Sequence, residues 1–159
     1  MGKIVITTNM SLDGVVEDPD GQEGFRLGGW FAERWAGRTG EFADRLNSLP
    51  KYVVSATVDE PRWANATVLR GDVLTEVAKL KAELDGEILV YASYQLGRTL
   101  IEHDLVDELR LVVFPVVLGA GQRLFGETTD KKPMHLIGTK TIGNGLAFLT
   151  YQLVRQPGD

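Results

Sequence analysis

This 159-residue sequence lacks several features, and each absence removes a class of function. It has no cysteine, so disulfides, thiol nucleophiles and cysteine-ligated metals are excluded. No apolar run approaches the ~18 residues of a membrane span. Residues 1–6 do not begin a secretion signal, because no long apolar stretch with a small-residue cleavage site follows. We therefore expect a cytoplasmic protein with no attachment to a membrane.

Positive charge and histidine are also scarce. The 17 Lys and Arg residues are outnumbered by 22 Asp and Glu residues, and the net charge of −5 argues against a nucleic-acid partner. His103 and His135 have no carboxylate or second histidine at metal-ligand spacing, so we expect no metal site. The sequence also contains no Walker-type loop and no Ser/His/Asp arrangement.

The remaining composition is typical of one globular domain over residues 1–159. Hydrophobic residues make up 43% of the chain and charged residues 25%. A chain of this length buries roughly two-thirds of the surface that it exposes when unfolded. We see no repeats, linkers or low-complexity tracts.

Runs typical of strands alternate with helical patterns, and the chain ends in a hairpin. The strand-like runs are residues 4–8, 51–55, 66–69, 87–91 and 109–118. Helical spacing covers residues 41–49, 73–84 and 93–102. Asp72 is the expected N-cap of the second helix, Pro115 interrupts the last strand, and residues 134–138 and 147–154 form a hairpin joined at 143–145. This order predicts an α/β fold: a mixed, mostly parallel sheet with flanking helices and an antiparallel C-terminal hairpin.

Three strand ends carry candidate binding residues: Ser55, Arg70-Gly71-Asp72, and Ala92-Ser93. Ligands collect at the carboxyl ends of parallel strands, and small residues before a helix let phosphate approach free N–H groups. Each set also has a plainer interpretation. Ser55 is then a strand-ending hydroxyl, Arg70 a surface charge, and Ala92-Ser93 a tight turn with an N-cap. These residues alone indicate no more than an α/β domain, for which nucleotide binding is one interpretation beside the plainer one.

Two other groups allow more than one interpretation. Asp13 in Ser11-Leu12-Asp13-Gly14 invites a catalytic role, but aspartate before glycine is usually a turn residue. Phe25, Trp30, Phe31 and Trp35 form an aromatic group that stacks on a planar ring, fills the core or mediates association.

Together these segments resemble the standalone bacterial relatives of the riboflavin-biosynthesis reductase domain, which have the dihydrofolate reductase fold. The matching segments, in family order, are Lys3-Ile4-Val5 with residues 11–14, then 49–55, 69–73, 88–93 and 105–125. No single segment is diagnostic, but the ordered set is specific and covers most of the chain.

The resemblance implies that the sheet binds NADPH and that hydride passes directly from the nicotinamide to a substrate ring or carbonyl-derived centre. Asn9 and Val16 match the backbone positions that hold the nicotinamide carboxamide. Ser55 and Arg70-Gly71-Asp72 match the adenosine side. Ala92-Ser93, Gln95 and Leu96 match the pyrophosphate turn, where the family often has Gly-Ser.

The resemblance breaks after Trp35. Relatives have a helix and a central strand there, ending in a Gly-Arg-x-Thr-Tyr segment that meets cofactor phosphates, whereas residues 31–40 lead straight to the helix before Pro50. Arg38-Thr39 fit better as the lead-in to that helix than as a substitute. Either the chain has a true deletion, which weakens cofactor binding, or a stretch is missing from this sequence. We favour the second explanation, because loss of an internal strand exposes two sheet edges.

Three functions follow. The first is an NADPH-dependent reductase of a small heterocyclic or carbonyl-type substrate. The second is a non-catalytic nucleotide- or pterin-binding module of the same fold, and the third is a scaffold with a Trp-rich surface. The resemblance also implies a homodimer that pairs through the C-terminal hairpin, although its apolar residues alternatively complete the monomer core. Those residues are Leu146, Phe148, Leu149, Tyr151 and Leu153.

Overall fold

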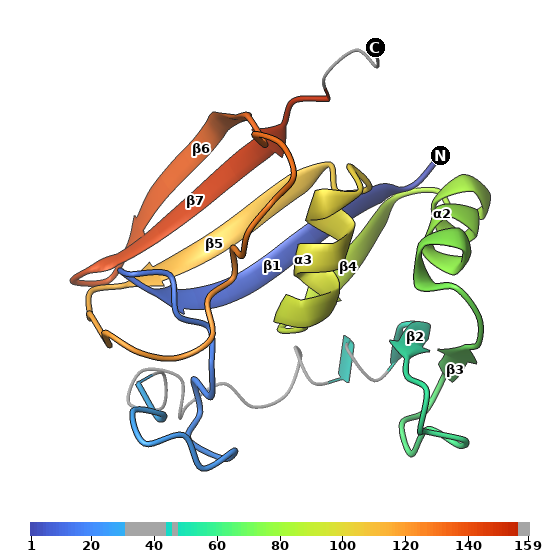
Figure 1. Ribbon diagram of the computed structural model, residues 1–159, viewed down its shortest axis with the longest axis horizontal. Helices are drawn as coiled ribbons and strands as arrows, with labels where there is room; N and C mark the ends of the chain where they lie inside the picture. Colours follow the sequence, from blue (N-terminus) through green and yellow to red (C-terminus); the bar gives the residue numbers. More distant parts are fainter. Residues whose placement is uncertain (31–43, 46–47, 156–159) are drawn as a thin grey trace.

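The computed structural model describes residues 1–30, 44–45 and 48–155, and within them it contains two separate sheets (Figure 1). The larger sheet has the strand order β4-β1-β5-β7-β6, and the smaller sheet pairs β2 with β3. The strands of the larger sheet are β1 (Lys3–Ser11), β4 (Glu87–Tyr91), β5 (Glu108–Phe114), β6 (Met134–Ile142) and β7 (Leu146–Leu153). The remaining elements are β2 (Lys51–Val54), β3 (Ala66–Leu69), α2 (Val73–Glu83) and α3 (Tyr94–Glu102).

The larger sheet is mixed, as the sequence predicts. β1 runs parallel to both β4 and β5, whereas β7 runs antiparallel to both β5 and β6. Residues 143–145 join β6 to β7, and the positive φ angles of Gly143 (56°) and Gly145 (148°) suit glycine at this turn. The predicted α/β class and C-terminal hairpin are therefore confirmed.

The prediction that β5 continues to residue 118 is wrong, because the strand ends at Phe114. Pro115 has no N–H to donate to the neighbouring strand, so the ladder stops there. The N–H of Val116 instead donates to the Phe114 carbonyl at 2.8 Å, which turns the chain away from the sheet.

The helix that starts after β3 begins where the sequence predicts. The Asp72 carboxylate accepts a hydrogen bond from the Thr75 N–H at 2.9 Å, so it caps α2. The following helix, α3, starts after Ser93 without any side-chain cap bond. The helix expected over residues 41–49 and the break expected near residues 35–40 lie largely outside the described residues.

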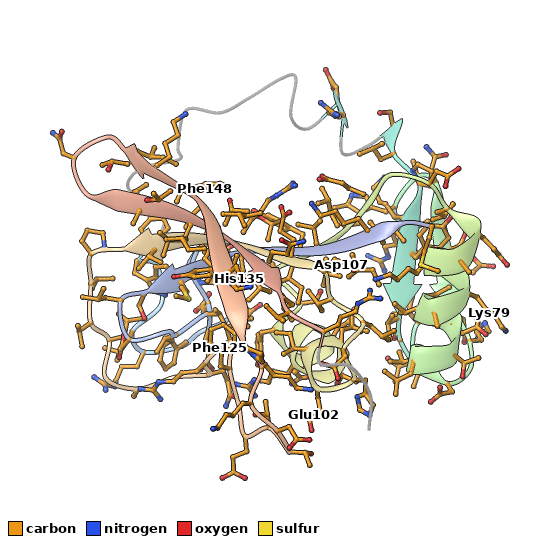
Figure 2. All side chains as sticks on the ribbon, turned by 90° about the horizontal axis from the view of Figure 1, so that it is seen from above. Lys79, Glu102, Asp107, Phe125, His135 and Phe148 are labelled. Carbon is orange, nitrogen blue, oxygen red and sulfur yellow. The ribbon has the colours of Figure 1, made fainter. Side chains whose placement is uncertain are left out.

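The larger sheet has an apolar cluster on each face. On one face, α2 and α3 pack over β1 and β5, with Ile4, Leu100 and Leu109 fully buried. On the other face, Phe114 and Leu146 form a smaller cluster. Phe148 packs against this second cluster and lies on the opposite side of the sheet from α3 in Figure 2.

The hairpin residues that the sequence offers as an association surface mostly pack within the monomer. Leu149, Tyr151 and Leu153 pack against the helix-side cluster, and Phe148 packs against the other. This arrangement supports the alternative that they complete the monomer core. It does not test whether the protein forms a homodimer.

β4 is an edge strand, because among the described residues it pairs only with β1. Its side chains Leu89 and Tyr91 are 50% and 53% exposed. The parallel pair β2–β3 lies apart from the larger sheet and is linked to it through α2 (Figure 1). Within the described residues, both sheets therefore have open edges on the sides that are not paired with each other.

Asp107 ties together four segments at the amino end of β1 (labelled in Figure 2). Its carboxylate accepts a hydrogen bond from the Ile4 N–H at 2.8 Å and pairs with Lys81 of α2 and, at 2.7 Å, with Arg155. The Lys81 side chain is only 8% exposed, and its ammonium also donates to the Leu105 carbonyl at 3.0 Å. Burial opposes the charged form of Asp107, yet the bonds from Lys81 and Ile4 outweigh it and lower the pKa of this carboxyl.

We expect Asp107→Asn to lower the free energy of unfolding at neutral pH by about 1–3 kcal/mol, because it leaves the buried Lys81 ammonium without its charged partner. The folded-state pKa of Asp107 lies below its unfolded value. The stabilisation is therefore present above the unfolded pKa, about 3.9, and is lost as pH falls through the folded pKa. Urea unfolding across this range should show the difference between wild type and variant shrinking with acid. A difference that does not change with pH would contradict this role.

Candidate functional site

The two strands that pair with β1 end at different positions along it, which leaves a step in the sheet. β4 follows β1 only as far as Thr7, opposite Tyr91, whereas β5 follows it to Ser11. Residues 8–11 of β1 therefore extend beyond β4, and there the chain leaves β4 to begin α3. We call the region formed by residues 8–11 and 92–96 the β1–β4 step. It lies at the carboxyl end of parallel strands, where ligands of such sheets bind.

The start of α3 supplies hydrogen-bond donors at this step. Ser93 occupies the N-cap position, but its hydroxyl donates to the Tyr91 carbonyl at 3.2 Å instead of accepting from the helix. The first turn also contains no acidic residue. The first N–H groups of a helix have no partner within the helix and carry partial positive charge, so this end of α3 suits an anion.

Of the predicted pyrophosphate residues, three are exposed at this helix start and one is not. Ala92, Ser93 and Gln95 are exposed, while Leu96 is half-buried and packs against the helix-side core. Ala92 has a φ of 55°, a left-handed conformation that glycine adopts at lower cost. This explains physically why Gly-Ser suits the position where this chain has Ala92-Ser93.

Of the two residues predicted for the nicotinamide end, Asn9 lies near the end of β1 and Val16 lies in the loop that follows it. Asn9 is inside the strand, opposite Val112 of β5. Val16 is 7% exposed, and its N–H donates to the Gln122 carbonyl at 2.8 Å. Ser11 holds the chain before Val16 close to the strand end, because its N–H donates to the Val15 carbonyl at 2.9 Å.

Asp13 serves as a turn residue. Its carboxylate accepts hydrogen bonds from the Ser11 hydroxyl at 2.6 Å, the Gly119 N–H at 2.8 Å and the Leu118 N–H at 3.2 Å. The Ser11 bond, followed by those from Gly119 and Leu118, lowers the pKa of Asp13 to about 2. A carboxylate fixed in this way joins the loops after β1 and β5.

Two of the predicted adenosine-side residues bind the same loop. The Ser55 hydroxyl accepts hydrogen bonds from the N–H groups of Thr57 and Val58 at 3.2 and 3.1 Å. Arg70 donates to the Asp59 carbonyl at 3.0 Å and pairs with its carboxylate at 3.4 Å. The structure therefore brings Ser55 and Arg70 together through residues 55–59. It also gives Arg70 the exposed ion pair expected of a surface charge.

The other two adenosine-side residues have clear structural roles. Gly71 has a φ of 140°, which side chains rarely tolerate, and it connects β3 to the N-cap of α2. The Asp72 carboxylate binds both the N–H and the hydroxyl of Thr75, and these bonds lower its pKa. Both residues shape the start of α2.

An open apolar hollow adjoins the Ser55 turn and was not predicted from the sequence. It is lined by Val53, Val58, Pro61, Arg62 and Trp63. The Trp63 ring is 64% exposed, and the Lys51 ammonium lies 5.8 Å from its centroid. An exposed indole beside aliphatic side chains suits a flat ring. The sequence signal that could have indicated this hollow is Trp63 itself, a lone tryptophan in a polar loop.

Two of the four residues of the aromatic group, Phe25 and Trp30, belong to the described chain. The Trp30 ring meets Phe114 edge-on with centroids 5.2 Å apart, and Phe25 is half-buried against Gly121. Phe31 and Trp35 lie outside the described residues. The two described members therefore contribute to packing.

Within residues 1–30, 44–45 and 48–155, no cluster of His, Asp or Glu side chains is arranged to hold a metal ion. His103 instead places its Nδ1 atom 3.0 Å from the Thr99 carbonyl on its own helix. In the described part of the chain, the helices are too short or too polar to span a membrane.

Comparison with known proteins identifies the class of this fold. Residues 29–148 match the model of the RibD C-terminal domain, so the chain belongs to that family of riboflavin biosynthesis reductase-like proteins. It is 35% identical over 106 residues to YyaP and 30% identical over 95 residues to YwjB, both from Bacillus subtilis. The matches cover 67% and 60% of this chain but only 56% and 55% of the two relatives, which are therefore longer.

Solved structures show the same fold at low identity. A putative riboflavin biosynthesis protein from Shewanella superposes with a TM-score of 0.72 at 21% identity, covering 96% of this chain and 99% of that one. A pyrimidine reductase-like protein from Corynebacterium diphtheriae gives a TM-score of 0.62 at 15% identity, with 97% and 92% covered. The predicted family and fold are thus confirmed.

The left-handed backbone at Ala92 gives a test of the local geometry. We expect Ala92→Gly to raise the free energy of unfolding by up to about 1 kcal/mol, because relief of the left-handed strain exceeds the entropy that glycine adds to the unfolded chain. Ala78→Gly, on the exposed side of α2, is the control and should lower stability by about 1 kcal/mol. Urea denaturation measures both. Equal destabilisation by the two substitutions would show that Ala92 is unstrained.

Proposed function

We propose that this protein is an NADPH-dependent reductase that transfers a hydride to a small heterocyclic or carbonyl-type substrate. The observation that carries the proposal is the uncapped start of α3 at the β1–β4 step. Its free N–H groups fit a pyrophosphate, and the extended end of β1 gives the cofactor a strand edge to lie along.

The site residues follow the arrangement of the described chain. Ala92, Ser93, Gln95 and Leu96 would hold the pyrophosphate through the first turn of α3. Asn9 and Val16 would hold the nicotinamide carboxamide at the end of β1. NADPH supplies the hydride when bound, and the protein orients it and excludes water.

The adenosine end would lie at the smaller sheet, where Ser55 follows β2 and where Arg70, Gly71 and Asp72 lead from β3 into α2. The hollow beside Trp63 adds an apolar surface on which adenine can stack. Arg70 is already paired with Asp59, so it would have to exchange that exposed ion pair for a phosphate.

Names of structural relatives support a heterocyclic substrate. One structure of this fold is a riboflavin biosynthesis reductase from Saccharomyces, with a TM-score of 0.54 at 14% identity. Another is the pyrimidine reductase-like protein from Corynebacterium. A cytoplasmic location is part of the same proposal, since NADPH chemistry of this kind takes place there.

The split between the two sheets favours a second candidate, a non-catalytic nucleotide- or pterin-binding module. In the described chain, β4 has no strand on its outer side. The sheet is therefore interrupted between the proposed pyrophosphate position at α3 and the proposed adenosine position at β2 and β3. NADPH oxidation followed with pyrimidine and pterin substrates separates the candidates. Turnover supports the reductase, whereas NADPH binding without turnover of any substrate supports the module.

We also propose that the protein is a homodimer that pairs through the β6–β7 hairpin. On the outer strand of this hairpin, Leu136 and Ile137 are 52% and 53% exposed. Sedimentation at micromolar concentration tests the proposal, and a wild-type protein that sediments as a monomer would rule it out.

A charge at the start of α3 tests the pyrophosphate position. We expect Ser93→Asp to keep or raise the melting temperature, because a negative charge at a helix N-terminus contributes ~0.3–1 kcal/mol. The same charge repels a pyrophosphate, so NADPH affinity should fall by about tenfold or more. Ser93→Asn, nearly identical in shape but neutral, is the control and should keep most of the affinity. Calorimetric titration measures both, and unchanged affinity in Ser93→Asp would place the phosphates elsewhere.

A further inference from the structure

The loops after β1 and β5 meet at the carboxyl end of the sheet and are joined along their backbones. The bonds across them are Leu12 N–H to Val116 O at 2.8 Å, Val16 N–H to Gln122 O at 2.8 Å, and Leu124 N–H to Gly14 O at 3.1 Å. The backbone around Val16 is therefore positioned by the second loop as much as by its own strand.

Close packing leaves the second loop little freedom at its contact with the first. A Cβ atom added to Gly121 would lie 2.7 Å from a methyl carbon of Val15 and 2.9 Å from the Phe25 ring. The φ of Gly121 is 116°, which is also unfavourable for side chains. Only glycine allows the backbone before Gln122 to approach this closely.

Glu17 completes the contact from the other side. Its carboxylate accepts a hydrogen bond from the Gln122 N–H at 2.8 Å, while the preceding residue, Val16, donates to the Gln122 carbonyl. The peptide groups on both sides of Gln122 are thus bound by two consecutive residues. Glu17 is itself fixed, because the Trp30 indole donates to its carbonyl at 3.2 Å and packs edge-on against Phe114.

Asp18 holds together the rest of the loop after β1, and its carboxylate accepts hydrogen bonds from within that loop. It is 1% exposed, and its carboxylate accepts the N–H groups of Glu23 and Phe25, both at 3.0 Å. The N–H of Glu23 is the main reason that its pKa is lowered despite burial. The loop after Glu17 is therefore internally rigid, and Glu17 is the side chain that connects it to Gln122.

We infer that Glu17 is a positioning residue for the nicotinamide end of the cofactor. By binding the Gln122 N–H, it holds the Gln122 carbonyl against the Val16 N–H and so sets where the Val16 backbone lies beside the end of β1. It does so through a hydrogen bond and not through its charge. The inference rests on the proposed NADPH site. Because Ser55 and Arg70 lie on the other sheet, the effect is confined to one end of the cofactor.

The test compares two ligands on three variants by calorimetric titration of the full chain. NADPH occupies both ends of the proposed site, whereas adenosine 2′,5′-bisphosphate occupies only the adenosine end. Glu17→Ala should weaken NADPH binding roughly tenfold, the scale of one lost hydrogen bond to a backbone N–H, and leave binding of the bisphosphate unchanged. Glu17→Gln keeps an acceptor oxygen and should restore most of the NADPH affinity. Glu23→Ala removes an exposed charge from the same loop and should change neither ligand.

Other outcomes overturn the inference. Equal weakening of both ligands by Glu17→Ala means that the substitution disturbs the whole fold, and no weakening means that Glu17 positions nothing. Failure of Glu17→Gln to recover NADPH affinity means that Glu17 acts through its charge. If wild type binds the bisphosphate but not NADPH, the nicotinamide end is not built and the inference fails alone. If wild type binds neither ligand, the proposed function fails and this inference fails with it.

Discussion

The unequal pairing of β1 is the constraint on which the rest of the structure depends. β5 supports this strand to Ser11, but β4 leaves it after Thr7. β5 thus pairs with β1 four residues further than β4 does, and α3 begins where β4 ends. The end of β1 is therefore left beside the first N–H groups of α3, which no side chain caps. The side chain alternation of the same strand buries Ile4 and Ile6 under the helices. Core and candidate site therefore arise from one strand.

The division into two sheets separates the proposed site into two parts. The pyrophosphate and nicotinamide positions belong to the larger sheet, whose loops are joined by Asp13 and Glu17. The adenosine position belongs to the β2–β3 pair, where Arg70 is held by Asp59. Among the described residues, this two-stranded sheet has no strand pairing with the larger sheet. This interruption is why the binding module is a specific alternative to the reductase.

Much of the fold was predictable because local chemistry determines it. Asp72 caps α2 as its position before an amphipathic run indicates, and the glycines at 143–145 predict the hairpin. The sequence predicts that Pro115 interrupts the strand over residues 109–118, whereas its missing N–H ends β5 at Phe114. Glu17 and Trp63 were missed for a different reason. Their roles depend on backbone groups and side chains brought together by tertiary structure, which no local spacing in the sequence encodes.

The proposed site places NADPH along the β1–β4 step with its phosphates at the start of α3. Amide chemical shifts of ¹⁵N-labelled protein during NADPH titration test it most directly. If NADPH lies there, the signals of Tyr94, Gln95 and Leu96 shift with a common affinity, and the Val16 signal shifts with them. Shifts that leave residues 94–96 unchanged, or that appear only in residues 55–63, would contradict it.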